Sequence, residues 1–504
     1  MTAVIVVGGG HNGLVAAVRL ARAGCRVTVL EQGAEPGGCI WTDRRDDGLV
    51  IERGAYEHGG ILPVVRELGL DDPALGAAAI RYVEHPVVTG FLFGDGQRRV
   101  FHVDAARTIA SLGADGAAYA ALVERAEMLF GMLDMFEQPP TPTQVAATLS
   151  QVPGGDELFR SLLQSAETLT AAAVRDPYLR AAICLQAAHA QVPHWAPGSG
   201  MFAFLLPGSH GSAAVRPEGG SRALTDALVA ALGAAGGTVR CGAKVASIAG
   251  GTLERSAPSG PFGGAIARAG HDVFSGPAAA ARVTLADGTV LEADAVISTI
   301  GLPRTADLLV DEAPRLRQAA RDLHSGHFNV SELTVTLIRD RQFDLGVEDT
   351  DAIYYAIGDP ADLRRGFAQV MAGQLPTAPW SMVGQVRQPA AVTGSVTWLS
   401  SIVPLERAEG AWTERTEREA ADRLVRHVST VLGRDLSDGV TEVVVSGPAT
   451  WAERTGGDGN PNHLDNTIDQ MLGWRAPGHA DGRTELPWLY LAGAGQHPGG
   501  GLSG

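Results

Sequence analysis

The first 31 residues constrain the fold of this chain more than any other part of it. An apolar run, Ala3-Val-Ile-Val-Val7, is typical of a strand buried on both faces, and it leads into the glycine-rich turn Gly8-Gly-Gly-His-Asn-Gly13. Leu14 to Ala23 has the pattern of a helix, and Val27 to Leu30 that of a second strand, with Glu31 at its end. This succession predicts a Rossmann-type βαβ unit.

The glycines of the turn occupy the three positions of the G-x-G-x-x-G pattern, and each has a physical reason. Gly8 makes the tight turn, Gly10 lets a pyrophosphate approach the backbone, and Gly13 lets the helix pack closely against the strand. The N-terminus of the helix then favours the anion, and the Glu31 carboxylate accepts the hydroxyls of a ribose. The pattern predicts a bound dinucleotide, either FAD or NAD.

A second glycine pair favours FAD. Pro36-Gly37-Gly38 follows the acidic residue closely, and in dinucleotide folds such a pair allows an additional close approach of the backbone on the flavin side. Apart from the chain-terminal glycines, the nearest candidate for a second such motif, Gly493-Ala-Gly495, lacks the third glycine. We therefore expect one Rossmann unit and no separate NAD domain.

Charge and cysteine content exclude several classes of function. The 504 residues include 40 basic and 56 acidic ones, a formal net charge of −16, so nucleic acid is not an expected partner. The four cysteines form no C-x-x-C pair, which argues against a disulfide reductase. There is no H-E-x-x-H motif, and the sequence indicates no metal site.

The chain also lacks the marks of secretion or membrane insertion. The N-terminus has no basic region followed by a cleavage site, and no apolar run reaches the ~18 residues of a membrane-spanning helix. We expect a cytoplasmic protein, and peripheral contact with a membrane stays open. The apolar face of Tyr119 to Phe136 fits the lining of a tunnel, such a membrane contact, or ordinary core packing, which we favour.

The rest of the chain mixes helices and strands. Among the clearer patterns are helices at residues 312–323 and 414–432, and strands at residues 293–300, 333–338 and 391–401. The chain ends with a strand beginning at Trp488 and a glycine loop that runs to Gly504.

These motifs together resemble the phytoene desaturase-like flavoproteins, an FAD-dependent oxidoreductase family within the flavin amine oxidase superfamily. The wording Gly-His-Asn-Gly-Leu at residues 10–14 is similar to the opening fingerprint of that family, and Gly37-Gly38 to its second glycine pair. Pro217 to Ser221 is similar to a middle signature. Residues 491–501, Leu-Ala-Gly-Ala-Gly-Gln-His-Pro-Gly-Gly-Gly, resemble its C-terminal flavin motif.

The resemblance implies an α/β protein with a Rossmann-type FAD-binding domain in three discontinuous segments and an α+β substrate domain. We place the FAD-binding segments at residues 1–80, 215–304 and 441–504, and the substrate segments at 81–214 and 305–440. The implied cofactor contacts are Gly8, Gly10, His11, Asn12, Gly13, Glu31, Gln32, Gly38, Cys39, Val245, Gly495, Gly501 and Leu502.

Candidate catalytic residues come from two loops. Tyr56, Glu57 and His58 follow a strand that the family runs towards the flavin, and we single out Tyr56 and His58. His497 lies inside the terminal glycine loop. The family normally continues past this loop into a helix that faces the flavin, whereas this sequence stops at Gly504, so we expect either a truncated chain or a missing helix dipole.

Three functions are compatible with these motifs. The first is desaturation or oxidation of a largely apolar substrate, lipophilic or polycyclic, by hydride transfer to flavin N5, with oxygen, a quinone or another carrier accepting the electrons. The second is a flavin-dependent cyclase or isomerase of specialised metabolism, with NAD(P)H as electron donor. The third is a non-catalytic scaffold stabilised by FAD. The first is the function that we expect.

Overall fold

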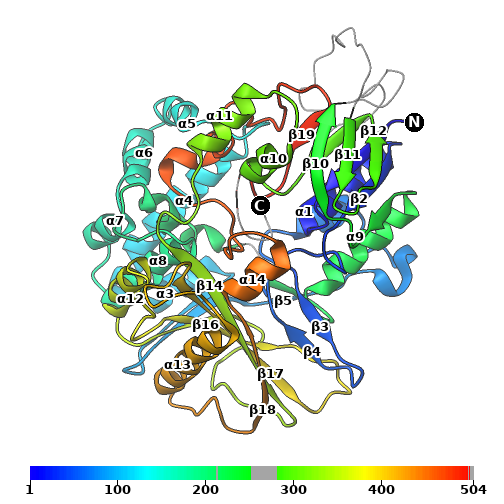
Figure 1. The fold of residues 1–504 in the computed structure, drawn as a ribbon. Helices are drawn as coiled ribbons and strands as arrows, with labels where there is room; N and C mark the ends of the chain where they lie inside the picture. The colour runs from blue at the N-terminus through cyan, green and yellow to red at the C-terminus, as the bar shows by residue number, and fades with distance from the viewer. Residues whose placement is uncertain (212–213, 251–280, 498, 500–504) are drawn as a thin grey trace.

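The computed structural model describes residues 1–211, 214–250, 281–497 and 499, which form two lobes built on two separate sheets (Figure 1). The first lobe holds a five-stranded parallel sheet in the order β19-β13-β1-β2-β9. Its strands are β1 (Ala3–Val7), β2 (Arg26–Leu30), β9 (Thr238–Arg240), β13 (Ala295–Ser298) and β19 (Leu489–Leu491). The predicted Rossmann-type arrangement from three separate segments is therefore confirmed.

Two layers cover this sheet. On one face, α1 (His11–Arg22) and α9 (Arg222–Ala234) bury apolar side chains such as Leu14 and Leu228 against β1 and β2. Gly24, with a φ of +87°, follows Ala23 at the end of α1, in the left-handed region that favours glycine. On the other face lies a three-stranded antiparallel sheet. Its strands are β10 (Val245–Gly250), β11 (Ala281–Leu285) and β12 (Val290–Ala293).

The second lobe holds a seven-stranded sheet in the order β18-β14-β17-β16-β15-β6-β7, antiparallel except for the parallel pair of β15 and β6. Its strands are β6 (Val87–Phe93), β7 (Arg98–His102), β14 (Val330–Arg339), β15 (Tyr354–Ile357), β16 (Ser381–Val386), β17 (Ser395–Pro404) and β18 (Val440–Ser446). Neighbouring residues of β17 face opposite sides: Leu399 packs with α13 (Glu414–Leu432), and Trp398 packs towards the helical part of this lobe.

A group of helices packs on the other face of the seven-stranded sheet. It consists of α3 (Ala105–Ser111), α4 (Gly116–Leu133), α5 (Pro142–Leu149), α6 (Gly155–Leu163), α7 (Ala166–Ala173), α8 (Pro177–His189) and α12 (Asp362–Met371). Tyr119, Leu122 and Leu129 of α4 are buried in the same core as Phe91 of β6, so this stretch serves core packing. In the part of the chain that the structure describes, no helix is both long and apolar enough to cross a bilayer.

The remaining elements connect the two lobes or cover their edges. They are the pairs β3 (Thr42–Arg44) with β4 (Val50–Glu52) and β5 (Tyr82–His85) with β8 (Ala214–Pro217), the helices α2 (Leu62–Glu67), α10 (Leu302–Leu308), α11 (Pro314–Asp322) and α14 (Pro448–Thr455), and the 3₁₀ turns η1 (Pro73–Ala78), η2 (Gly113–Asp115), η3 (Ser199–Phe204), η4 (Pro207–Ser209), η5 (Ile468–Gln470) and η6 (Leu472–Arg475).

The division into five segments stays a prediction at the level of its boundaries. Strands β6 and β7 belong to the second sheet and β9 and β13 to the first, in keeping with the segments at 81–214 and 215–304. Strand β18, however, pairs with β14 in the second sheet. By sheet membership we therefore move the last boundary from residue 440 to a position after Ser446.

Candidate functional site

The turn between β1 and α1 has the geometry that its glycines predict. Gly8 has a φ of +106°, which side chains rarely allow. A Cβ atom on Gly13 would lie only 2.0 Å from the carbonyl oxygen of Gly8, so glycine is required for α1 to approach β1 this closely. The helix N-terminus carries neither a side-chain cap nor an acidic residue in its first turn, and its N–H groups are therefore suited to an anion.

Glu31, at the end of β2, is held in place by backbone hydrogen bonds. Its Oε2 accepts from the N–H of Gly9 at 2.9 Å, and its Oε1 accepts from the N–H of Gly33 at 2.7 Å. A carboxylate has about four lone-pair sites, so both oxygens keep capacity for further donors. This orientation suits the hydroxyls of a ribose.

The second glycine pair lies directly against the first glycine turn. Gly37 forms a parallel bridge with Gly10, and a Cβ atom on Gly38 would lie 3.2 Å from the Cα of Gly10. Cys39 follows, with its Sγ 3.6 Å from the carbonyl oxygen of Pro461, and burial raises the pKa of this thiol to about 11. Cys39 is thus a neutral wall residue rather than a thiolate.

Both lobes line a cavity of about 640 Å³ that begins at this turn. The predicted cofactor contacts that line it are Gly8, Gly10, His11, Asn12, Gly13, Glu31, Gln32, Gly38, Cys39 and Val245. They come from residues 8–39 and from β10, so folding brings these two regions together. That each of them contacts the cofactor stays a prediction.

The structure gives a different result for the site residues predicted near the C-terminus. Gly495 follows β19 and packs against Gly301, where a Cβ atom would lie 2.9 Å from the Gly301 Cα, while its neighbour Ala494 lines the cavity. Gly501 and Leu502 lie outside the described residues. His497 is half-buried and is not among the residues that line the cavity. Burial, with Arg475 nearby, lowers its pKa to about 4.

Arg454 is a cavity residue that sequence reasoning missed. It comes from α14, and its Nε donates to the carbonyl oxygen of Gly38 at 3.3 Å. Its guanidinium carbon lies 4.8 Å from the ring centroid of Trp41. The contact places a cation beside the second glycine pair, where a negatively charged phosphate would approach the backbone. Nothing in the sequence around residue 454 resembles a phosphate-binding motif.

Buried histidines surround the opening of α1. His11 lines the cavity, and its Nε2 has no hydrogen-bond partner among the described residues. Burial, with His463 nearby, lowers the pKa of His11 to about 4. His58 is fully buried, its Nδ1 lies 2.9 Å from the hydroxyl of Tyr82, and burial lowers its pKa to about 3. His58 is absent from the cavity lining, although it lies close enough to His11 for that ring to contribute to its lowered pKa.

Tyr56 lines the cavity, but its hydroxyl is occupied. It accepts a hydrogen bond from Nη1 of Arg216 and donates one to the carbonyl oxygen of Gln385. Arg216 also lies over the tyrosine ring, with its guanidinium carbon 4.0 Å from the centroid. Burial raises the pKa of Tyr56 above its usual range. The catalytic roles of Tyr56, His58 and His497 all stay predictions.

Two carboxyl groups line the cavity, and both lie close enough to Tyr355 to raise the pKa of its hydroxyl. Glu57 follows Tyr56, and Glu332 comes from β14, where its Oε1 accepts a hydrogen bond from Ser400. Burial raises the pKa of both carboxyl groups, while Arg216 opposes this for Glu57. Glu57 adjoins the two catalytic candidates Tyr56 and His58 in the sequence, whereas no motif indicates Glu332. A lone acidic residue just before the apolar strand predicted at 333–338 was the available signal.

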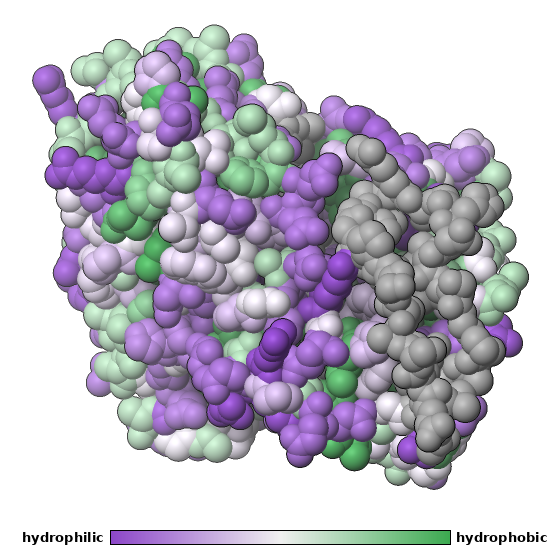
Figure 2. Space-filling view, turned by 90° about the horizontal axis from the view of Figure 1, so that it is seen from above, coloured by the Kyte–Doolittle hydropathy of each residue, from purple (hydrophilic) through white to green (hydrophobic). Residues whose placement is uncertain are grey.

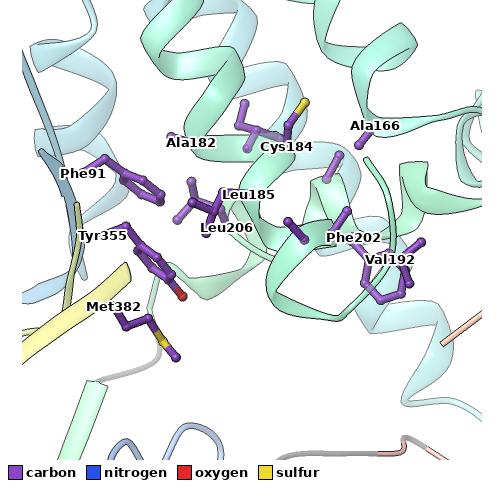
Figure 3. Close-up of a cluster of buried hydrophobic side chains, with 14 of the residues drawn as sticks. Phe91, Ala166, Ala182, Cys184, Leu185, Val192, Phe202, Leu206, Tyr355 and Met382 are labelled. Carbon is purple, nitrogen blue, oxygen red and sulfur yellow. The ribbon is translucent and has the colours of Figure 1, made fainter. Parts of the chain in front are cut away.

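Aromatic and aliphatic side chains line the part of the cavity that the second lobe forms. Figure 3 shows Leu206 and Met382 near the ring of Tyr355, and all three residues line the cavity. Tyr355 stacks on Phe91 with a centroid distance of 5.0 Å, and its hydroxyl lies 2.7 Å from Nδ1 of His189. The second lobe thus supplies a largely apolar surface that contains a few polar groups.

The residues present fit FAD. The steric requirement for glycine at Gly13, the uncapped start of α1 and the oriented carboxylate of Glu31 suit the diphosphate and ribose of a dinucleotide. The cavity continues from there to the second lobe and leaves room for a further ring system. Fold and site together define a dinucleotide-binding oxidoreductase with one Rossmann unit.

The comparisons with known proteins identify the family. The model for flavin-containing amine oxidoreductases matches residues 13–504. The chain belongs to this family and is an FAD-dependent oxidoreductase. Solved structures agree in fold: putrescine oxidase bound to putrescine superposes with a TM-score of 0.58 at 17% identity, covering 97% of this chain and 92% of that one. Cyclohexylamine oxidase from Brevibacterium oxydans gives 0.53 at 14% identity, covering 98% and 93%.

Curated relatives match mainly over short regions. The chain spans about a quarter of the length of the mycobacterial proteins it matches, among them an uncharacterised protein of Mycobacterium tuberculosis that is 35% identical over 139 residues, 26% of this chain and 25% of that protein. The hydroxyneurosporene desaturase of Cereibacter sphaeroides is 59% identical over 39 residues, 8% of each chain. The resemblance to phytoene desaturase-like flavoproteins is confirmed at the level of the family.

Proposed function

We propose that the protein desaturates or oxidises a largely apolar small molecule by removing a hydride from one of its C–H bonds. Bound FAD supplies the hydride acceptor, N5 of the flavin. The observation that carries the proposal is the continuity of the cavity, which extends from the glycine turn of the first lobe to the apolar wall of the second. A substrate in the second half of this cavity would lie directly beside the cofactor.

The wall determines which molecules fit. Tyr355, Trp398 and Met382 present rings and a thioether to the cavity, and such surfaces bind apolar groups and exclude water. The stacking of Tyr355 on Phe91 and its hydrogen bond to His189 hold its ring in one orientation. The protein therefore positions its substrate by shape more than by polar contacts.

Glu57 is our candidate for the proton acceptor. Its carboxyl group lines the cavity, and burial raises its pKa towards the range in which a carboxylate accepts protons effectively. The buried cation of Arg216 opposes this rise and thus favours the carboxylate form. Tyr56 is less suited to this role, since its hydroxyl is bonded on both sides.

The first test is anaerobic reduction of the purified holoprotein. We expect a lipophilic or polycyclic substrate to bleach the visible flavin band without any added reductant, and oxygen or a quinone to restore it. Bleaching by NADPH alone would favour the reductive cyclase or isomerase instead. A tightly bound flavin that neither treatment bleaches would favour the scaffold function.

The second test assigns the proton acceptor. Glu57→Gln should lower the rate of flavin reduction by substrate about 100-fold, in the range of general base catalysis, and leave FAD binding intact. Glu67→Gln is the matched control, because Glu67 is exposed and, among the described residues, its one ion pair is with Arg19 on the surface. An unchanged rate and pH profile in Glu57→Gln would eliminate Glu57 as the base.

Oxidation of an amine is the second candidate. Two carboxyl groups in an aromatic wall, Glu57 and Glu332, suit a protonated amino group on an otherwise apolar substrate. Putrescine oxidase, solved with putrescine bound, and cyclohexylamine oxidase share the fold of this chain, which supports this alternative. Flavin bleaching by a set of hydrophobic amines, and not by their hydrocarbon counterparts, would favour this function over desaturation.

A further inference from the structure

A group of three metal-ligating side chains lies outside the cavity. His85 ends β5, and Asp349 and Asp351 belong to the loop before β15. One ligand atom from each of the three lies within 4.8 Å of the other two. The sequence indicates no metal site here, because His85 is far in sequence from the two aspartates and no short motif contains all three.

The burial of His85 and its unpaired ring nitrogen point to a missing ligand. Its side chain is only 6% exposed, and the structure gives its buried Nδ1 no hydrogen-bond partner among the described residues. Buried polar atoms are nearly always paired, with protein, water or an ion.

The carboxylates retain free capacity. Asp349 forms no ion pair within the described ranges, and its Oδ1 accepts only the N–H of Asp351, at 2.9 Å. Asp351 pairs through Oδ2 with Nη1 of Arg387, also at 2.9 Å. Arg387 is 46% exposed and can withdraw into solvent when a cation binds. Both aspartates are partly exposed, which gives an ion access to the site.

We propose that His85, Asp349 and Asp351 bind one divalent transition-metal ion such as Zn²⁺, with water completing its coordination. Imidazole nitrogen suits zinc-like ions better than Mg²⁺ or Ca²⁺, and carboxylate oxygens complete a mixed set of three protein ligands. The net charge of −16 also favours cation binding.

The ion joins two adjacent strands. His85 precedes β6, whose Val88 and Thr89 line the cavity, and Asp351 precedes Ile353 and Tyr355, which line it too. Strands β6 and β15 are parallel neighbours, with Tyr354 opposite Gly90. An ion bound at the start of both strands therefore holds in place the two strands whose side chains line the cavity. The ion itself lies outside the cavity.

Calorimetric titration tests the site in the FAD-loaded, untagged and chelator-treated protein. Zn²⁺ should bind at one ion per chain and raise the midpoint of thermal unfolding by about 2 °C, whereas Mg²⁺ should bind at least about tenfold more weakly. His85→Gln and Asp349→Asn should each weaken Zn²⁺ binding at least about tenfold. Co²⁺ should give a visible spectrum that both variants lose.

Asp344→Asn is the matched control, because Asp344 lies in the same region and pairs with Arg434 at the surface. It removes the same charge and should leave Zn²⁺ binding unchanged. The flavin spectrum reports whether each variant is folded. Absence of saturable Zn²⁺ binding in the wild type, or wild-type binding in a folded His85→Gln protein, would overturn the proposal.

Discussion

At the scale of single residues, glycines that resemble one another in the sequence have different roles. Gly13 sits where a Cβ atom would lie 2.0 Å from a backbone oxygen, whereas Gly131 in α4 has nothing within 4 Å of such an atom. Gly13→Ala should therefore abolish FAD binding, because the backbone of β1 and α1 must separate. The visible absorbance of the purified protein relative to its protein absorbance measures this loss.

Gly131→Ala makes the same chemical change without the clash. We expect it to keep FAD and to raise the free energy of unfolding by about 0.5–1 kcal/mol, since alanine is the better helix former. A Gly13→Ala protein that binds FAD as tightly as the wild type would contradict the role given to the close approach of α1 and β1.

Arg454 offers a second test at this scale. Because its Nε contacts Gly38 and its guanidinium lies on Trp41, we expect it to pair with the cofactor diphosphate. Arg454→Gln should weaken FAD affinity about 10- to 100-fold, as the loss of a hydrogen bond between charged groups does. Fluorescence titration of the apoprotein measures the Kd. Arg415→Gln, at a side chain that is 82% exposed, should not change it.

These residues also show what sequence could predict. Gly8 and Glu31 lie on the loops of one continuous βαβ unit that begins with β1, so their spacing along the chain determines their geometry. Arg454, Glu332 and Tyr355 reach the cavity only because α14, β14 and β15 fold against the first lobe. No local pattern records a contact of that kind, and each residue looks ordinary in its own segment.

At the scale of elements, Glu52 connects a hairpin to a helix. It ends β4, its Oε2 accepts from the Thr42 hydroxyl of β3 at 2.7 Å, and its Oε1 accepts from the N–H of Ser221 at the start of α9. The side chain is 1% exposed, and burial raises its pKa to about 7 from an ordinary 4.5.

A raised carboxyl pKa has a definite consequence for stability. The protonated form is favoured in the folded state, so the contribution of Glu52 is complete below about pH 4.5 and is lost as pH rises to about 7. The loss amounts to about 3 kcal/mol. Thermal unfolding at pH 5 and pH 8 should show a smaller difference for Glu52→Gln than for the wild type. An exposed control, Glu67→Gln, should keep the wild-type difference.

The bounds of a helix or strand could be predicted where its hydrophobic pattern is regular. The helix expected at residues 414–432 has the same bounds in α13, because its apolar face repeats with the helical period over 19 residues and its ends are marked by Thr413 and Gly433. The strand expected at 391–401 is instead β17, Ser395–Pro404. Residue 391 belongs to a turn and residues 392–394 have no regular structure, and burial on both faces of β17 leaves no alternation to define its start.

At the scale of the whole molecule, the cofactor site is a product of both lobes. Its lining combines the glycine turns of the first lobe with α14, β14 and β15. On the face seen in Figure 2, hydrophilic residues are interspersed with hydrophobic ones, so the described part of that face offers no broad apolar area for a membrane. The substrate-sized apolar surface is inside, between the lobes.

FAD should therefore stabilise the two lobes together. At a free concentration of 1,000 times its Kd, a ligand that binds only the folded state adds about 4 kcal/mol. In hydrogen–deuterium exchange we expect FAD to protect residues 8–13 and 37–39 of the first lobe, and also residues 454–463 around Arg454 and His463. Peptides from α13, which lies on the far face of the second sheet, should exchange equally with and without FAD. Protection confined to residues 8–31 would mean that the cofactor engages the Rossmann unit alone and that the contacts of α14 with the cavity are not used in binding.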